Sequence, residues 1–422
     1  LKILKKSGLE EARVSLSVDG YSTITNIAAR SVSPRGKPQV MKRSAIVHRS
    51  GTLENPRVPD LGTAEFWIPG AAVGGIVEYR YERVYTAPDM VPVWVFANRL
   101  PVLRSEFNLT ADPRVKADYR WGKEGKLVNK KPLLRRTSDG RDRLVFVEKA
   151  LAPVHPEAGS PHPAWLSPWL VVGVSSAEIG ESKYRMETWG HVGERMSYFA
   201  DIVGDGGIIP QGSAESRFRT IRKKLNPVVA PGLGVLAPAS PMAVAQGDPI
   251  CSRDAAAVMV RALRDAGEDA YIALLTGNAG PPVLRGFPGL YPFIRAVVAV
   301  DVHERVQGES SCGGRAGEKS VLCSTAPHGY AFIDPFCTRC RFGELPTALT
   351  GGRALILSSK TPEWGDVPID PPERNFTVTL SALRVSLNGA VEGDVRIAVG
   401  GEAARRVRAA LEGANPDASE GQ

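Results

Sequence analysis

The sequence predicts an α+β protein of several domains in which antiparallel β-structure predominates. At 422 residues the chain exceeds the roughly 100–200 residues of an ordinary domain, so we expect about two or three hydrophobic cores. Its 43 Gly and 33 Pro residues indicate many turns, which favours short strands over long helices. In the middle of the chain one clear helical pattern precedes apolar strands, which predicts a helix packed on an antiparallel sheet.

Residues 1–180 predict an N-terminal antiparallel β-sandwich. Short apolar runs alternate with turn signals such as Ser138-Asp139-Gly140 and Asp112-Pro113. The expected strands cover residues 12–18, 64–68, 76–84 and 143–147. Prolines then crowd residues 150–170. Because proline cannot donate to a sheet ladder, we expect a linker or an extended segment there, before the next domain.

Residues 186–345 predict the domain in which a helix packs on an antiparallel sheet. A first helix is expected over residues 186–202, where Trp189, Val192 and Met196 have helical spacing. The clearest helix covers residues 252–266, because apolar residues recur there at intervals of three and four and Gly267 follows its end. Strands are expected at residues 270–275, 296–302 and 330–333.

Residues 346–422 return to a β pattern and predict the start of a C-terminal β-sandwich. The expected strands cover residues 354–357, 376–380, 383–387 and 395–399, with Asn388-Gly389 as a hairpin turn and a helix over 402–411. This region holds fewer than about 80 residues, a marginal size for a domain, so we expect it to be incomplete and the chain to be a fragment.

The composition argues against nucleic-acid binding and membrane spanning. The net charge is +8, but the densest basic stretches, Lys130-Lys131 with Arg135-Arg136 and Arg405-Arg406 with Arg408, are short and lack interleaved aromatic residues. No run approaches the ~20 apolar residues of a transmembrane helix, so the chain is expected to be soluble. No pattern indicates a cofactor, and none indicates an oligomeric state.

Five cysteines divide into a cluster and one solitary residue. Four clustered cysteines predict two disulfides, and disulfides indicate a periplasmic or extracellular protein, although no signal peptide is visible in this chain. A four-thiolate zinc site is the alternative, but one pair alone has the usual two-residue spacing. Reduced structural thiols are a third interpretation. The clustered residues are Cys312, Cys323, Cys337 and Cys340.

Cys251 is the solitary cysteine and a candidate nucleophile. It lies at the expected N-terminus of the clearest helix, where unpaired N–H groups and the helix dipole favour a thiolate. Gly247-Asp248-Pro249 can form the turn that presents it. The alternative is a buried cysteine that fills space in the core.

A resemblance extends the interpretation of Cys251. Gly247-Asp248, Cys251, Ala255 and the run from Leu263 to Ala270 resemble the nucleophile helix of the transglutaminase-like superfamily, whose core is papain-like. The resemblance implies Cys, His and Asp in chain order as the catalytic residues. Asp334, in Phe332-Ile333-Asp334-Pro335, stands at the aspartate position, and Arg295 stands at the histidine position. Pro249 and Ile250 are additional to the family pattern.

The flanking segments resemble the same group of proteins. Ile68-Pro69-Gly70 and the run from Val73 to Tyr79 are similar to a β domain of unknown function that precedes such cores in bacterial envelope proteins. Phe342-Gly343-Glu344-Leu345-Pro346 and Gly352-Arg353-Ala354-Leu355 are similar to the passage into their C-terminal β domain.

The missing histidine decides the functional prediction. The base must take a proton from the thiol and return it, whereas an arginine guanidinium stays protonated in proteins. We therefore expect Arg295 to form an ion pair with Asp334. His303 lies roughly eight residues beyond Arg295, about 25 Å along an extended strand, and His328 is expected at the far end of the Asp334 strand. The other histidines lie in separate segments; they are His48, His155, His162 and His191.

Three hypotheses follow. The first is a transglutaminase-like protein without catalytic activity, which binds a protein or peptide partner at the cell envelope. The second is an active cysteine peptidase or amide acyl-transferase, in which Cys251 is the nucleophile, Asp334 the orienting group and a displaced histidine the base. The third is a purely structural envelope protein in which Cys251 is inert.

Overall fold

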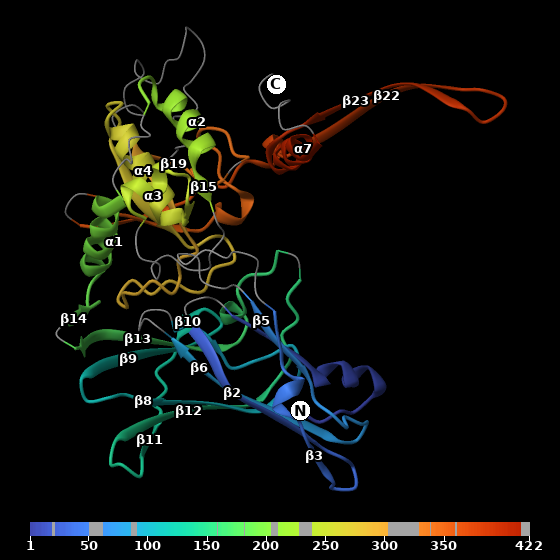
Figure 1. Cartoon of the computed structure of the whole chain (residues 1–422), viewed down its shortest axis with the longest axis vertical. Coiled ribbons are helices and arrows are strands. Elements are labelled where there is room, and N and C mark those ends of the chain that lie inside the picture. Colours follow the sequence, from blue (N-terminus) through green and yellow to red (C-terminus); the bar gives the residue numbers. More distant parts are fainter. Residues whose placement is uncertain are drawn as a thin grey trace.

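The structure is a computed structural model of the whole chain and describes all residues except 19–21, 50–61, 86–90, 158, 181, 204–209, 228–238, 303–328, 338, 359–360 and 415–422. It is a mixed fold, mostly β, with several antiparallel sheets, as Figure 1 shows. The N-terminal sheets lie at one end of the molecule, and the helices gather around a separate sheet at the other end. None of the described helices is both long and apolar enough to cross a membrane.

The chain begins with two small sheets that share one core. The 3-10 turns η1 (Lys6–Ala12) and η2 (Arg43–Ala45) accompany β1 (Arg13–Ser17), β2 (Ser22–Val32), β3 (Pro38–Val40), β4 (Val47–Arg49), β5 (Thr63–Trp67) and β6 (Ile76–Tyr85). The sheets have the orders β1-β5-β4 and β3-β2-β6. Alternate residues of β1 and β5 point inward, and Val14, Phe66 and Val77 are buried together between the sheets.

A second pair of sheets follows, with its own aromatic core. Its strands are β7 (Trp94–Val95), β8 (Val102–Thr110), β9 (Val115–Lys123), β10 (Lys126–Leu127), β11 (Leu133–Arg136), β12 (Asp142–Leu151), β13 (Pro168–Ile179) and β14 (Ser182–Arg185). The sheets have the orders β10-β9-β13-β14 and β11-β12-β8. Their core contains Phe96, Trp121, Phe146 and Leu170. The sandwich expected over residues 1–180 is therefore distributed over four small sheets with two cores.

The proline-rich stretch combines an irregular segment with ordered structure. Pro163 is the first residue of the 3-10 turn η4 (Pro163–Trp165). Proline is favourable at this position because an N–H there would have no acceptor within the turn. Pro168 is the first residue of β13, which pairs with β9 along most of its length. Between β12 and η4 the described residues form no helix or strand, and Ser160 N–H donates to the Glu157 carbonyl in a turn.

The middle of the chain forms a sheet covered by helices. Its helices are α1 (Trp189–Val203), α2 (Ala214–Lys224), α3 (Pro241–Ala245) and α4 (Ser252–Arg264), and β15 (Asn226–Pro227) pairs in parallel with β16 (Pro249–Ile250). β17 (Ala270–Leu275), β18 (Arg295–Asp301), β19 (Tyr330–Ile333), β20 (Arg353–Ile356) and β21 (Glu363–Asp366) form an antiparallel sheet of order β19-β18-β17-β20-β21. α4 packs on one face, against Ala296, Val298 and Val300.

The strands expected beyond residue 346 belong to two different places. After the 3-10 turn η5 (Thr347–Leu349), β20 pairs with β17, so β20 and β21 extend the central sheet. After η6 (Pro372–Arg374), β22 (Thr377–Val385) and β23 (Val391–Val399) form a separate two-stranded hairpin, followed by α7 (Gly401–Ala414). In the described residues this end of the chain is a hairpin and a helix, without a second sheet facing it.

Candidate functional site

Cys251 occupies the N-cap position of α4. Gly247 has a φ of 76°, which turns the chain after α3, and the short strand β16 then leads into the cysteine. The backbone of Cys251 is extended, with φ −89° and ψ 171°, and its N–H donates to Asp254 Oδ2 at 3.5 Å. Asp254 thereby caps the helix that the apolar spacing predicts.

The environment of Cys251 favours the neutral thiol. Its side chain is only 7% exposed, and burial followed by the negative charge of Asp254 raises the pKa of the thiol to about 11. Arg253 opposes this shift without overcoming it. Burial and the charge of Asp254 therefore act against the thiolate that the helix N-terminus is expected to favour.

A buried ion pair lies directly beside Cys251. Arg253 Nη2 donates to Asp254 Oδ1 at 3.0 Å, and the side chains of both residues are 1% exposed. The sequence prediction missed this pair. The sequence does contain two adjacent charged residues in the first turn of the predicted helix, and their burial became visible only in the structure, where every residue from Ser252 to Leu263 except Arg261 is buried.

Arg295 and Asp334 form the second ion pair of the site. Arg295 Nη1 lies 3.3 Å from Asp334 Oδ2, with the Arg295 side chain 23% exposed and the Asp334 side chain fully buried. Burial raises the pKa of Asp334, although Arg295 and the N–H groups of Phe336 and Cys337 act in the opposite direction. The ion pair expected between these two residues is present.

Phe336 holds both partners of that pair. Its N–H donates to Asp334 Oδ1 at 3.0 Å, and its ring lies 4.5 Å below the Arg295 guanidinium. The guanidinium is thus fixed by a carboxylate at one edge and an aromatic face beneath it.

One hydrogen bond ties the start of α4 to the start of β18. Ala296 N–H donates to Ser252 Oγ at 3.3 Å. Since Cys251 and Arg295 immediately precede these two residues, both lie at the same end of the helix and the sheet. The charges that perturb the Cys251 thiol nevertheless come from Asp254 and Arg253, while Arg295 is engaged with Asp334.

The described histidines are occupied elsewhere. His162 Nδ1 accepts from Ala164 N–H at 3.1 Å at η4, and His191 Nδ1 accepts from Glu187 N–H at 3.2 Å at the start of α1. His48 lies in β4, and His155 follows β12. His303 and His328 lie outside the described residues.

The cysteine cluster contains one disulfide within the described residues, between Cys337 and Cys340. In this form the two sulfurs cannot act as thiolate ligands of zinc. Cys312 and Cys323 lie outside the described residues. The disulfide closes the turn that follows β19, in which Cys337 N–H donates to the Asp334 carbonyl at 3.2 Å.

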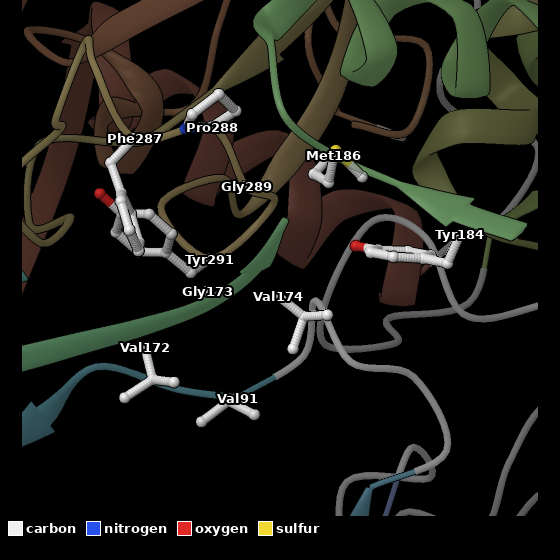
Figure 2. A pocket seen from close by; sticks show the side chains of 10 residues that line it. All are labelled: Val91, Val172, Gly173, Val174, Tyr184, Met186, Phe287, Pro288, Gly289 and Tyr291. Atoms are coloured by element: carbon white, nitrogen blue, oxygen red, sulfur yellow. The ribbon is translucent and has the colours of Figure 1, made fainter. Parts of the chain in front are cut away.

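A narrow apolar pocket lies away from Cys251, where the second N-terminal pair of sheets meets the central region. Phe287 and Tyr291 approach from the loop before β18, and Val172 approaches from β13 (Figure 2). Tyr184 and Met186 line the side nearest α1. Phe287 packs so closely that a Cβ at Gly173 would lie 2.8 Å from its ring.

Comparison with known proteins gives a family match for the N-terminal region and a solved structure of similar fold. Residues 1–155 match a family described as a domain of unknown function with a solved structure, DUF3857. The sequence has no significant match among curated proteins. The fold resembles a 2.00 Å crystal structure from Parabacteroides distasonis, described as a "putative protease", with a TM-score of 0.56 and 12% sequence identity. That similarity covers 91% of this chain and 72% of the other.

Proposed function

We propose that the central region is a papain-like, transglutaminase-like core that has lost acyl transfer and binds a protein or peptide partner. The ion pair between Arg295 and Asp334 carries this proposal. In the family order of Cys, His and Asp, Arg295 stands where the base belongs, and it is held by the carboxylate that would orient a histidine.

The chemistry of the site supports the loss of activity. Acyl transfer by a thiol needs a group that takes the thiol proton and later gives it to the leaving amine. A guanidinium cannot exchange that proton near neutral pH. Cys251 itself is a buried neutral thiol, whose pKa is raised to about 11 by burial and by Asp254.

The proposed organisation is an N-terminal β region over residues 1–180, a core that begins at residue 186 and extends through β21 (Glu363–Asp366), and a C-terminal β region that begins after β21. The boundary expected at residue 346 is moved because β20 and β21 belong to the central sheet. We also propose that the protein acts at the cell envelope, in the periplasm or outside the cell. The Cys337–Cys340 disulfide supports this location, since disulfides persist mainly in oxidising compartments.

An assay of the purified full chain tests the proposal. The substrates are glutamine-containing and unmodified peptides, each with and without an amine acceptor, and the control is Cys251→Ser. We expect the wild type and the variant to give the same background. Hydrolysis or cross-linking that Cys251→Ser abolishes would show that the core is an enzyme.

A second candidate is a cysteine peptidase, which the fold similarity to a structure described as a protease favours. It requires an imidazole nitrogen within about 4 Å of the Cys251 sulfur. Single alanine substitutions of His303 and His328 separate the candidates, because loss of a Cys251-dependent activity in either variant would identify the displaced base.

A further inference from the structure

The hairpin of β22 and β23 stands away from the rest of the protein, joined to it beside α7 (Figure 1). Its strands pair without interruption from Thr377 opposite Val399 to Val385 opposite Val391. Within the described residues, each strand pairs only with the other, so the outer edges of both are unpaired. Nearly every side chain of the hairpin is exposed, including large aliphatic ones.

The two faces of the hairpin differ in charge. Residues directly opposite each other in an antiparallel pair share a face. One face carries no charged residue and has five aliphatic side chains that are 54–69% exposed, namely Leu383, Val385, Val391, Val395 and Ile397. The other face carries all four charges of the two strands, namely Arg384, Glu392, Asp394 and Arg396.

Such a hairpin calls for a further strand. An isolated two-stranded hairpin is only marginally stable in water, and three or more strands with an apolar face are the usual minimum. Proteins commonly protect an exposed edge with proline, a bulge or charged side chains. β23 contains no proline and its register with β22 is regular, while its three charged side chains include both signs and can be matched by a partner strand of complementary charge. Its outer edge is therefore open to pairing.

The charge pattern of β23 identifies the partner. If β23 pairs antiparallel with β23 of a second copy, centred on Val395, then Asp394 lies opposite Arg396 of the second copy, and the reverse pair forms as well. In the described structure neither residue takes part in an ion pair. In the same register Glu392 lies opposite Ala398 of the second copy, and Gly393 lies opposite Ile397, so no two like charges lie opposite each other.

The outer edge of β22 lacks this complementarity. If β22 paired antiparallel with β22 of a second copy, centred on Ser381, Arg384 would lie opposite Val378 and no ion pair would form. We propose that β23 pairs with β23 of a second copy of this chain, forming a four-stranded sheet β22-β23-β23-β22. Both uncharged faces then lie on one side of the sheet, and the reciprocal ion pairs lie on the other.

Charge reversal in the full chain tests this register. By sedimentation velocity over a range of concentrations, the wild type is expected to form a dimer. Asp394→Arg and Arg396→Asp should each weaken the dimer about tenfold or more, because each change replaces both ion pairs with repulsion. The double variant that carries both changes should restore it. Arg384→Gln, on the same face but on the other strand, should leave it unchanged.

Cross-linking gives a second measurement that does not depend on charge. Val395→Cys should form a dimer through a disulfide, because residue 395 faces its own copy across the two-fold axis. Leu383→Cys, equally exposed but on β22, should not. A chain that stays monomeric at every concentration, or a dimer that the charge reversals leave intact, would overturn the proposal. Dimers cross-linked through Leu383→Cys instead would indicate that the uncharged faces pack together.

Discussion

Two opposing effects act on the thiol of Cys251. The helix N-terminus favours the thiolate, whereas burial and the carboxylate of Asp254 favour the thiol and raise the pKa of Cys251 to about 11. A rise in pKa from 9.0 to about 11 lowers the thiolate fraction at pH 7 about 100-fold.

The alkylation rate of Cys251 therefore depends steeply on pH. With iodoacetamide under non-reducing conditions, we expect very slow labelling at pH 7 and a rate that still rises about tenfold per pH unit above pH 9. Mass spectrometry of the Cys251 peptide measures it, and the same peptide in unfolded protein is the control. Rapid labelling of the native protein at pH 6–7 would show an activated thiolate instead.

Arg295 neutralises a carboxylate that is completely buried. Removing it in Arg295→Met leaves Asp334 without its cation, so we expect the free energy of unfolding to fall by about 3 kcal/mol at neutral pH. Burial already raises the pKa of Asp334, and the loss of Arg295 raises it further. The cost of losing Arg295 is therefore smallest below the raised pKa that Asp334 has in the folded wild type, which lies above the ordinary aspartate value of about 4, and it grows as the pH rises beyond that point.

Denaturant unfolding at several pH values measures this effect. The matched control is Arg353→Met. It removes a more exposed ion pair, in which Arg353 Nη1 lies 2.9 Å from Asp366 Oδ1, and it should lower the free energy of unfolding by less than about 1 kcal/mol. The double variant Arg295→Met with Asp334→Asn should recover much of the loss. A cost that does not change between pH 4 and pH 8 would be evidence against a buried charge at Asp334.

At the scale of single elements, local periodicity predicted the central region well. β17 and β19 have the expected bounds, and α4 ends at Arg264, two residues before the expected end. Their patterns are strong because these strands are buried on both faces and most residues of α4 are buried, with Arg261 and Arg264 exposed. For such elements the sequence carries the structural signal locally.

Pairing between distant segments could not be predicted in the same way. β22 is one continuous strand where two were expected, because the Ser381-Ala382 step resembles a break although both residues pair within the hairpin. β20 was expected in the C-terminal region but pairs with β17, a partner about 80 residues away that no local pattern specifies. The candidate site was likewise predicted only in part. Arg295 and Asp334 were predicted through a family resemblance, whereas burial, which decides the state of Cys251, depends on tertiary packing.

The N-terminus of α4 joins stability and thiol chemistry in one element. Asp254 caps the helix, neutralises Arg253 and raises the pKa of Cys251. In Asp254→Asn the cap is largely kept, but the buried ion pair with Arg253 is broken, so we expect the free energy of unfolding to fall by about 3–5 kcal/mol. The pKa of Cys251 should fall at the same time, which makes its alkylation at a fixed pH faster.

Two measurements on Asp254→Asn check these effects separately. Denaturant unfolding reports the stability, and the iodoacetamide rate of the native protein reports the thiol. Asp265→Asn is the control, because Asp265 lies beyond the other end of α4 in an exposed pair with Arg261. Unchanged alkylation in a folded Asp254→Asn protein would mean that burial alone sets the pKa of the thiol.

At the scale of the whole molecule, the loop before β18 connects the N-terminal sheets to the central region. Phe287 is 5% exposed and packs with Trp169 and Val171 of β13, and Arg120 of β9 lies 4.7 Å above its ring. Trp165 Nε1 donates to the Gly280 carbonyl at 3.0 Å. The loop is thus part of the core of its neighbour, so the two regions are coupled by packing.

Removing the Phe287 ring should uncouple the two regions. Phe287→Ala leaves a cavity against β13. We expect the packing between the two regions to lose about 3–5 kcal/mol of stabilisation, while the core of each region is unaffected. In scanning calorimetry, a wild-type transition shared by both regions should separate into two, with the N-terminal sheets and the central sheet unfolding at different temperatures. Leu103→Ala, at a side chain that is 89% exposed, is the control and should leave the wild-type profile unchanged. If Phe287→Ala lowers the whole profile without separating it, the regions are coupled mainly through other contacts, such as the hydrogen bond of Trp165.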